Sequence, residues 1–322
     1  MSVRFHSSAV RLVADVGGTN TRVALFDPVR AEFRSVSVYR NSEHESLEDV
    51  FTHWLDALTE PAPDICCLAV AAPPSADQVV MCNIDWSFSC RELANRFGFQ
   101  RVRRLNDFEA NAYALPHLTH ADRQQLYPAG SNPSGRLATI GPGTGLGGAF
   151  LDDCNGLPRS FPCEPGHMSL APANELELDV FRLLLPRHSN IYAELLVSGP
   201  GLARLYGAVG AISGKRATDL APAEITRLAV ASEDSLCVLA LETFCALLGS
   251  VCGDFLLANG SYGGLYLAGG IAPKLTTFIG KTAFHRRLTD KGAMGPILGG
   301  VPVYVITNDY PGLLGAAHAP LP

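Results

Sequence analysis

The sequence lacks three features that would settle its class at once: a long apolar run, a basic excess and paired cysteines. No uninterrupted apolar run reaches about 18 residues, so we predict no membrane span. Residues 1–8 lack the apolar core and cleavage site of a signal peptide, which predicts a cytoplasmic protein. The net charge of −6 argues against nucleic acid as the main partner, because no basic stripe exists to neutralise phosphates.

The nine cysteines are an odd count, and none of them forms a Cys-x-x-Cys pair. Most lie within apolar segments, which is typical of reduced and partly buried thiols. We therefore expect neither a disulfide framework nor a zinc site built from them. A P-loop is excluded as well, because residues 210–216 have the wrong spacing and ending for that motif.

The length of 322 residues predicts one large or two medium domains. In the N-terminal third, β-branched apolar runs predict strands, and a helical apolar period after Ser46 predicts a helix capped by this serine. Strands joined by hairpins and then by a crossover helix predict a mixed sheet. The expected elements are strands at 9–15, 21–27, 33–40 and 64–72, a helix at 46–58, and a strand at 101–105 before a helix from about 108.

The rest of the chain repeats the opening pattern once and then becomes mainly helical. A strand at 136–140, a glycine turn and a strand at 146–151 echo the first hairpin, which indicates internal duplication of one αβ unit. The segment 235–258 is apolar on most faces and is predicted to be a buried central helix. The remaining expected elements are helices at 174–185, 199–208, 222–231 and 234–258, strands at 263–268 and 301–306, and a short final helix.

The first hairpin carries the most informative motif, Asp15-Val16-Gly17-Gly18-Thr19-Asn20-Thr21-Arg22. A glycine pair can adopt a positive φ at little cost, so we expect a tight turn that leaves backbone N–H groups open to a phosphate. The acid at the start of the motif is suited to holding a nucleotide's Mg²⁺ through water. Taken alone, the motif fits both an ordinary β-turn and a phosphate loop.

Two further glycine turns follow strands, at 141–148 and at Gly269-Gly270. Residues 143–148 match G-x-G-x-x-G, but a dinucleotide fold needs a helix directly after that motif, and Leu146 to Leu151 predicts a strand. Two hairpin turns from two halves of the chain can instead clamp one triphosphate. The hydroxyls of Thr19 and Thr144 would then be additional donors.

Asp107 stands at the end of one predicted strand and the start of a predicted helix, in Leu105-Asn106-Asp107-Phe108. The position fits a helix N-cap. It also fits a general base, a carboxylate that accepts a hydroxyl proton as that oxygen attacks phosphorus. The two roles are compatible.

Glu164, His167 and Glu194 lie in segments rich in proline and glycine. Ionised carboxylates accept hydrogen bonds and imidazole can accept or donate, which suits several hydroxyls of one sugar. Solvated loop acids and a structural histidine fit these positions too. Glu164 and His167 have no evident third ligand nearby, so no metal site is expected there. The segment Asn83 to Phe88 fits either a sugar pocket or a polar strand end.

In this order, the motifs resemble those of the bacterial ATP-dependent glucokinases of the hexokinase–actin ATPase superfamily. The resemblance runs over nearly the whole chain, and although each motif is weak alone, several in family order are specific. The matching segments are Val13 to Arg22 and Gly141 to Gly147 (phosphate motifs), Leu105 to Phe108 (catalytic motif), Glu164 to His167, Glu194, Val197 to Leu202, Leu267 to Lys274 (adenosine motif) and Asn308 to Gly315 (C-terminal signature).

The resemblance implies transfer of the γ-phosphoryl group of ATP, with Mg²⁺, to the 6-hydroxyl of D-glucose. It implies that Asp107 is the catalytic base and that Asp15 organises the Mg²⁺. The implied sugar contacts are Asn106, Glu164, His167 and Glu194. The implied nucleotide contacts are Ala14, Asp15, Val16, Gly17, Gly18, Thr19, Gly143, Thr144, Gly145, Gly269 and Gly270.

The implied fold is α/β, with two domains of the actin-like ATPase (ribonuclease H-like) type, mixed sheets and an interdomain cleft. Closure of that cleft on the sugar would exclude water, which competes as phosphoryl acceptor. We expect a small domain at 1–109 plus about 302–322, and a large domain at 110–301. The expected partner is glucose or a related hexose, without nucleic acid or membrane, and a homodimer is compatible with the resemblance.

The sugar loop departs from the family pattern. Pro165 stands where the family usually has a second glycine, and Ser169 where some members carry an acid. Proline fixes φ near roughly −65° and removes an N–H donor, so the difference concerns the sugar loop rather than the phosphate motifs. Two alternatives therefore stay open: a kinase for another hexose or an amino sugar, and a non-catalytic sugar sensor on the same fold.

Overall fold

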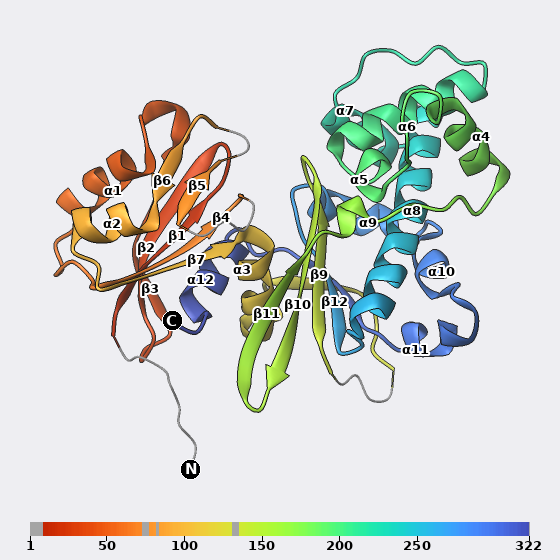
Figure 1. The fold of residues 1–322 in the computed structure, drawn as a ribbon. Coiled ribbons are helices and arrows are strands. Elements are labelled where there is room, and N and C mark those ends of the chain that lie inside the picture. Colours follow the sequence, from red (N-terminus) through yellow and green to blue (C-terminus); the bar gives the residue numbers. More distant parts are fainter. Residues whose placement is uncertain (1–8, 73–76, 82–83, 131–134, 322) are drawn as a thin grey trace. The chain divides into compact units, whose positions relative to one another are not determined.

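The protein is described by a computed structural model that covers residues 9–72, 77–81, 84–130 and 135–321 and divides into two compact units (Figure 1). Unit 1 comprises residues 1–118, 153–160 and 308–322, and unit 2 comprises residues 119–152 and 161–307. These limits differ from the expected limits at 109 and about 302. Helix α3 (Asp107–Ala114) packs on α12 (Pro311–His318) within unit 1, whereas β13 (Val303–Ile306) pairs inside the sheet of unit 2.

Unit 1 contains the mixed sheet that the sequence predicts. The strand order is β3-β2-β1-β4-β7, with antiparallel pairing in the hairpins and parallel pairing from β1 to β4 and from β4 to β7. The strands are β1 (Arg11–Val16), β2 (Asn20–Asp27), β3 (Glu32–Arg40), β4 (Ile65–Val70) and β7 (Arg101–Asn106), and a separate pair is formed by β5 (Gln78–Val80) and β6 (Ser87–Ser89).

Side chains alternate along β1 and so reach both faces of this sheet. Leu12, Ala14 and Val16 join a core with residues of α1 (Leu47–Asp56) and α2 (Cys90–Phe97). The predicted cap of α1 is confirmed, because Ser46 Oγ accepts the backbone N–H of Asp49 at 3.2 Å. Helices α3 and α12 contact the strands as well, and two 3₁₀ turns, η1 (Asn41–Glu43) and η2 (Leu115–His117), complete the unit.

The sheet of unit 2 repeats the arrangement of unit 1, as the echo between the two hairpins predicts. Its order is β11-β10-β9-β12-β13-β8, with an antiparallel hairpin of β9 and β10, parallel pairs on the other side of β9, and an antiparallel edge strand, β8. The remaining strand bounds are β8 (Arg123–Tyr127), β9 (Leu137–Pro142), β10 (Leu146–Cys154), β11 (Leu157–Cys163) and β12 (Gly264–Leu267).

A long helix, α8 (Ser235–Asn259), lies at the centre of the unit 2 core, which confirms the predicted buried helix. The helix is long and apolar enough to cross a membrane, but 83% of its most apolar 18-residue stretch is buried inside the fold. The other helices are α4 (Glu175–Leu184), α5 (Ala193–Leu196), α6 (Gly199–Ile212), α7 (Pro222–Val230), α9 (Thr276–Ile279), α10 (Phe284–Thr289) and α11 (Gly295–Gly299), with 3₁₀ turns η3 (Pro165–His167), η4 (Ala272–Leu275) and η5 (Gly292–Met294).

Candidate active site

The first glycine turn joins β1 to β2 and is held from outside by Asn41, which the sequence did not single out. Asn41 Nδ2 donates to the carbonyl oxygen of Gly17 at 2.8 Å, and its backbone N–H donates to the carbonyl oxygen of Thr19 at 2.9 Å. Its Oδ1 accepts the hydroxyl of Thr21 at 2.8 Å. The side chain is only 4% exposed. Asn41 therefore fixes both ends of the turn whose N–H groups are the candidate phosphate donors.

Asp15 precedes this turn on β1, directly opposite Arg22 on β2. An Arg22 Nη1 to Asp15 Oδ2 contact of 3.4 Å joins the pair, and the Arg22 guanidinium also lies over the ring of Tyr310, 5.0 Å from its centroid. Burial raises the pKa of Asp15, and Arg22 opposes that rise. A Cβ at Gly312, in the first turn of α12, would lie 2.9 Å from the Asp15 carboxylate. Any larger residue at position 312 would therefore collide with this carboxylate.

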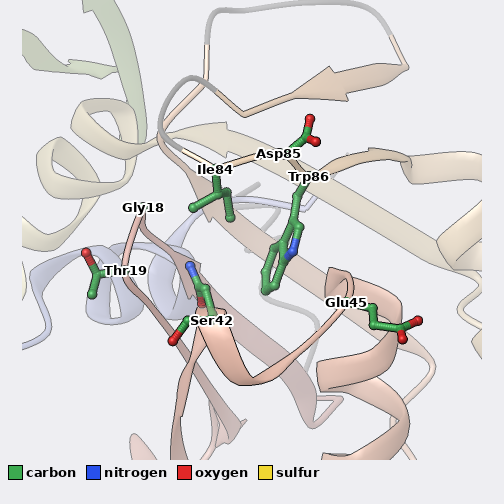
Figure 2. A pocket seen from close by; sticks show the side chains of 8 residues that line it. Gly18, Thr19, Ser42, Glu45, Ile84, Asp85 and Trp86 are labelled. Atoms are coloured by element: carbon green, nitrogen blue, oxygen red, sulfur yellow. The ribbon is translucent and has the colours of Figure 1, made fainter.

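Beside the first turn, a hollow of about 420 Å³ opens in unit 1 (Figure 2). The carboxylates of Glu45 and Asp85 point away from its centre, while the indole of Trp86 forms part of its wall. The sequence of the segment Asn83 to Phe88 fits either part of a sugar pocket or a polar strand end. Asn83 lies outside the described residues, and Ser87 begins β6. The lining residues are Gly18, Thr19, Asn41, Ser42, Glu45, Ile84, Asp85 and Trp86.

Asp107 is the first residue of α3, and the N-cap is Asn106. Asn106 Oδ1 accepts the backbone N–H groups of Phe108 at 3.0 Å and Glu109 at 3.4 Å, while Glu109 Oε2 accepts the N–H of Asn106 at 3.3 Å. The prediction that Asp107 caps the helix is therefore wrong, because a reciprocal capping box starts one residue earlier. Asp107 Oδ1 accepts the backbone N–H of its neighbour Phe108 at 2.9 Å.

Sheet register places Asp107 on the same edge as the first turn. Val16 pairs with Val70, and Val70 pairs with Asn106, in parallel ladders. Because the carboxyl ends of parallel strands meet at one edge, the residues that follow β1 and β7 lie two strand spacings apart, about 10 Å. A carboxylate and a candidate phosphate turn thus share one edge of the unit 1 sheet.

The second glycine turn, in unit 2, is held by Glu194 and by the start of α6. Leu146 N–H donates to Glu194 Oε2 at 2.8 Å, and Gly199 N–H donates to the carbonyl oxygen of Gly143 at 2.8 Å. A Cβ at Gly145 would lie 2.5 Å from Glu194 Oε2, so the carboxylate can approach only a glycine. Thr144, at the tip of the turn, is exposed.

Gly269 joins this group from the end of β12. Its φ of +81° is the left-handed region that glycine adopts without strain, and a Cβ there would lie 2.6 Å from the carbonyl oxygen of Pro142. Gly269 therefore packs backbone to backbone against the start of the second turn in unit 2, whereas a Cβ at Gly270 would meet nothing within 4 Å.

Glu164 and His167 lie at the two ends of η3. Their side chains are 71% and 65% exposed, with 3.8 Å between Glu164 Oε2 and His167 Nδ1, and the imidazole stacks on Tyr192 with ring centroids 5.8 Å apart. Pro165 occupies the first position of η3, where a missing N–H costs little, and its ring packs against the backbone at Gly148. The departure at Pro165 is thus accommodated by the local structure.

Comparison with known proteins supplies the family. The glucokinase family model matches residues 12–321. The chain belongs to the glucokinase family. A glucokinase of Chromobacterium violaceum is 39% identical over 319 residues, covering 99% of this chain and 91% of that protein, and one of Saccharophagus degradans is 36% identical over 309 residues, covering 95% and 96%. The crystal structure of glucokinase from an Antarctic psychrotroph has a TM-score of 0.88 at 36% identity, with 97% of this chain and 98% of that chain covered.

Membership in the glucokinase family makes this chain an ATP-dependent sugar kinase, a phosphotransferase, and the α/β fold with mixed sheets agrees with it. Within each unit the structure brings the motif residues together. In unit 1 these are the first turn, Asp15 and the strand end at Asn106-Asp107, and in unit 2 they are the second turn, Glu194 and Gly269. Sequence reasoning missed Asn41 because no local motif marks a residue 24 positions after the glycine it binds.

Proposed function

We propose that this glucokinase-family chain transfers the γ-phosphoryl group of ATP to the 6-hydroxyl of D-glucose, in the cytoplasm and as a step of glycolysis. The names of its relatives support glucose as the acceptor. The observation that carries the proposal is the placement of Asp107 on the same sheet edge as the first glycine turn, about 10 Å away across two strands. That spacing leaves room for a phosphoryl group and the hydroxyl that attacks it.

Asp107 is the proposed general base. Its carboxylate would accept the proton of the 6-hydroxyl as the hydroxyl oxygen attacks the γ-phosphorus in line with the leaving ADP oxygen. The capping box at Asn106 supports this role, because it fixes the first turn of α3 without using the Asp107 side chain as the cap. The backbone therefore holds the base in one position on a regular element.

The two glycine turns are the proposed phosphate sites, at Gly17 to Thr19 and at Gly143 to Gly145. The N–H groups of Gly17 and Gly143 close the turns by donating to the carbonyl oxygens of Asn20 and Gly145, so the N–H groups that follow them in each turn are the proposed donors. Ala14, Asp15 and Val16 would flank the first of them, and Gly269 and Gly270 would lie against the adenosine. Asp15 fits the Mg²⁺ that accompanies ATP, because this ion usually keeps several waters and takes one or two carboxylates besides the phosphates. The ion would supply charge neutralisation on the transferring group.

The proposed sugar contacts are the side chains of Asn106, Glu164, His167 and Glu194. The high exposure of Glu164 and His167 supports this proposal. Their mutual contact is long, 3.8 Å between His167 Nδ1 and Glu164 Oε2, so both side chains can turn to a bound ligand without breaking a short hydrogen bond. Glu194 would use its Oε1 for a sugar hydroxyl while Oε2 keeps its bond to Leu146 N–H. Carboxylates and imidazole together recognise hydroxyls that both donate and accept.

We further propose the actin-like two-domain arrangement of the hexokinase–actin superfamily, with units 1 and 2 as its domains. The repeated order of an antiparallel hairpin followed by parallel strands in the two sheets supports this proposal. Closure of the domains on the sugar would exclude water from the phosphoryl acceptor site.

A coupled assay for ADP, run with ATP, Mg²⁺ and a panel of aldohexoses and amino sugars, tests the function. We expect glucose to have the highest kcat/KM, and a higher value for another sugar would assign the chain to that sugar instead. Glucose binding without ADP formation would identify a sensor. Absence of turnover with every sugar would contradict the kinase proposal.

Asp107→Asn tests the base. We expect kcat to fall by about 10²–10⁴-fold while the affinity for glucose changes little, because the amide keeps a similar shape but cannot take the proton. Asp290→Asn, at an exposed position in unit 2, is the matched control and should leave kcat unchanged. Retention of kcat in the Asp107 variant would remove the base assignment.

A further inference from the structure

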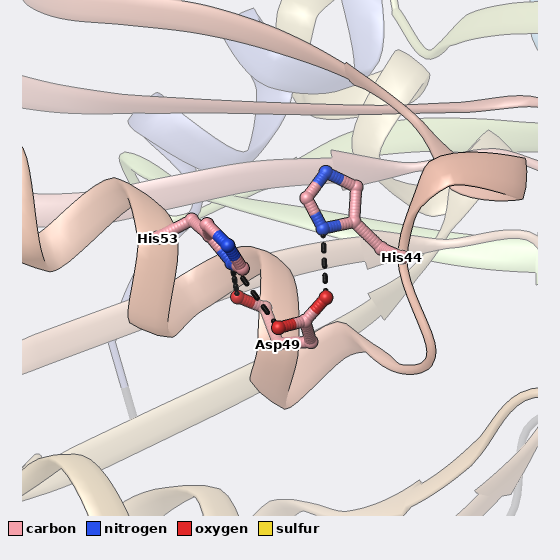
Figure 3. Close-up of side chains that lie close together, drawn as sticks. All are labelled: His44, Asp49 and His53. Carbon is pink, nitrogen blue, oxygen red and sulfur yellow. Dashed lines mark hydrogen bonds and ion pairs between the residues drawn. The ribbon is translucent and has the colours of Figure 1, made fainter.

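Three side chains of unit 1 bring nitrogen and oxygen ligand atoms together at a place that the proposed reaction does not use (Figure 3). Asp49 and His53 come from α1, and His44 comes from the segment between η1 and α1. His44 Nδ1 lies 2.8 Å from Asp49 Oδ2, and His53 Nδ1 lies 3.1 Å from Asp49 Oδ1. One ligand atom from each residue lies within 4.8 Å of the other two.

The local structure explains why these side chains converge. Residues four apart lie on the same face of a helix, so Asp49 and His53 lie one turn apart on the same side. The cap at Ser46 fixes the first turn of α1 and with it the backbone of Asp49. The His44 ring is held by edge contacts with Tyr39 and His53, each with centroids 5.2 Å apart.

The cluster is closed on one side and open on the other. The side chain of His44 is 10% exposed, that of Asp49 32% and that of His53 60%. An ion can therefore enter from the side of His53 and keep water on its open face. His44 is held in place before any ion arrives, which reduces the entropy lost on binding.

We propose that His44, Asp49 and His53 bind a divalent transition-metal ion of the zinc type. Two imidazoles and one carboxylate form a donor set that suits Zn²⁺ and Co²⁺, with water as a fourth ligand. Mg²⁺ and Ca²⁺ prefer sites made of oxygen alone, so the Mg²⁺ of the kinase reaction does not compete for this one.

The distances are compatible with such an ion. Bonds of about 2.0–2.1 Å in a tetrahedral site place ligand atoms about 3.3 Å apart. The two histidine-to-Asp49 separations of 2.8 and 3.1 Å need to widen by only a few tenths of an ångström. The ligand atoms of the two histidines lie within 4.8 Å of each other, and rotation of the exposed His53 side chain can bring them to about 3.3 Å. His53 Nδ1 also lies 2.9 Å from the backbone carbonyl oxygen of Asp49, so without an ion it donates a proton there. Metal binding therefore requires each imidazole to carry its proton on Nε2 and to turn its bare Nδ1 to the ion.

Calorimetric titration of the metal-stripped full chain with Zn²⁺, in excess Mg²⁺ and without ATP or sugar, tests the site. We expect one Zn²⁺ per chain in the wild type and an affinity at least tenfold lower in His53→Gln, whose exposed side chain can be replaced without affecting the core. Asp49→Asn should lose affinity similarly. Because neither substrate is present, the result is independent of whether the chain phosphorylates glucose.

Two control variants separate this cluster from other donors, His120→Gln at an exposed histidine and Cys154→Ser at an exposed thiol. Both should bind Zn²⁺ as the wild type does. Substitution of Co²⁺ for Zn²⁺ should give the visible absorption bands of a tetrahedral ion in the wild type and in both controls, but not in His53→Gln. Equal affinity of the wild type and His53→Gln, or no stoichiometric Zn²⁺ binding by the wild type, would overturn the proposal.

Discussion

Asn41 shows how much of a phosphate site depends on a residue that need not touch the ligand. It is buried, and its side chain and backbone together hold Gly17 and Thr19 in unit 1. We predict that Asn41→Ala raises the KM for ATP by about tenfold, because the turn N–H groups lose their fixed direction, while the KM for glucose changes less. Initial-rate kinetics with each substrate varied in turn measure the two constants.

Two variants separate positioning from simple loss of stability. Asn41→Asp keeps the acceptor for Thr21 but loses the donor to Gly17, so it should raise the KM for ATP as well. Thr21→Val removes only the hydroxyl that Asn41 accepts, and it should have the smaller kinetic effect. Equal increases in both KM values in every variant would show that Asn41 acts only through folding.

At the level of single residues, the sequence predicts what a local motif contains and little else. Asp15, Asp107 and the glycine turns are identifiable because neighbours in sequence carry the signal. Asn41 binds a glycine 24 positions earlier, and Asn106 displaces Asp107 as the cap through a reciprocal bond with Glu109. Both depend on distances that only the folded chain sets.

At the level of elements, α12 packs so closely on α3 that one position tolerates only glycine. A Cβ at Gly315 would lie 1.7 Å from the carbonyl oxygen of Ala110 in unit 1. We predict that Gly315→Ala lowers the free energy of unfolding by about 1–3 kcal/mol or more, because the two helices must move apart. The matched change Gly207→Ala, on the exposed side of α6 with nothing within 4 Å, should instead raise it by about 0.5–1 kcal/mol.

Urea unfolding of the two variants beside the wild type measures both signs of this effect. A loss of stability in both would contradict the assignment of the Gly315 effect to its close contact with α3, because Gly207 has no such contact. No loss in Gly315→Ala would mean that α12 can shift away from α3 without cost.

The start of α8 gives an element-level prediction with a pH dependence. Asp234 accepts the backbone N–H groups of Leu236 and Cys237 at 2.8 Å each, and these bonds hold the pKa of Asp234 below its ordinary value of 3.8. A lowered pKa in the folded state means that the stabilisation is present at neutral pH and is lost as the pH falls through that lowered pKa. Asp234→Ala should therefore lose about 1 kcal/mol at neutral pH, and less in acid.

Asp234→Asn is the matched control, because asparagine caps helices about as well as aspartate but carries no charge. It should retain most of the stability at neutral pH. Unfolding free energies at a series of pH values compare the three proteins. A difference between wild type and Asp234→Ala that stays constant down to pH values below 3.8 would contradict the charge contribution.

Elements were predictable where their own residues determine them. The apolar period of α8 and the alternation of the hairpin strands are local, and both were confirmed. The short helices α9 and α11 have four and five residues, too few to form without tertiary contacts, and their sequences carry no clear period. The strand β8 was missed because it is a half-exposed edge strand with mostly polar residues.

For the whole molecule, the two units have separate hydrophobic cores, and the chain passes from unit 1 to unit 2 and back twice. Both tryptophans, Trp54 and Trp86, belong to the core of unit 1. Tryptophan fluorescence therefore reports unfolding of unit 1, whereas far-ultraviolet circular dichroism is dominated by the longer helices of unit 2. Chains with two cores commonly depart from two-state unfolding. In the absence of ligand we therefore expect the fluorescence and circular dichroism signals to give different unfolding midpoints.

The proposed sugar contacts lie on both units, Asn106 on unit 1 and Glu194 on unit 2, so a bound glucose should stabilise both. We predict that glucose at about 100 times its dissociation constant adds about 2.7 kcal/mol to the free energy of unfolding. It should also bring the unfolding midpoints of the fluorescence and circular dichroism signals together, because neither unit can unfold without releasing the ligand. A sugar that the assay panel shows is not phosphorylated, at the same concentration, is the control. If glucose raised only the circular dichroism midpoint, the sugar would be held by unit 2 alone, and Asn106 and Asp107 would lose their proposed roles.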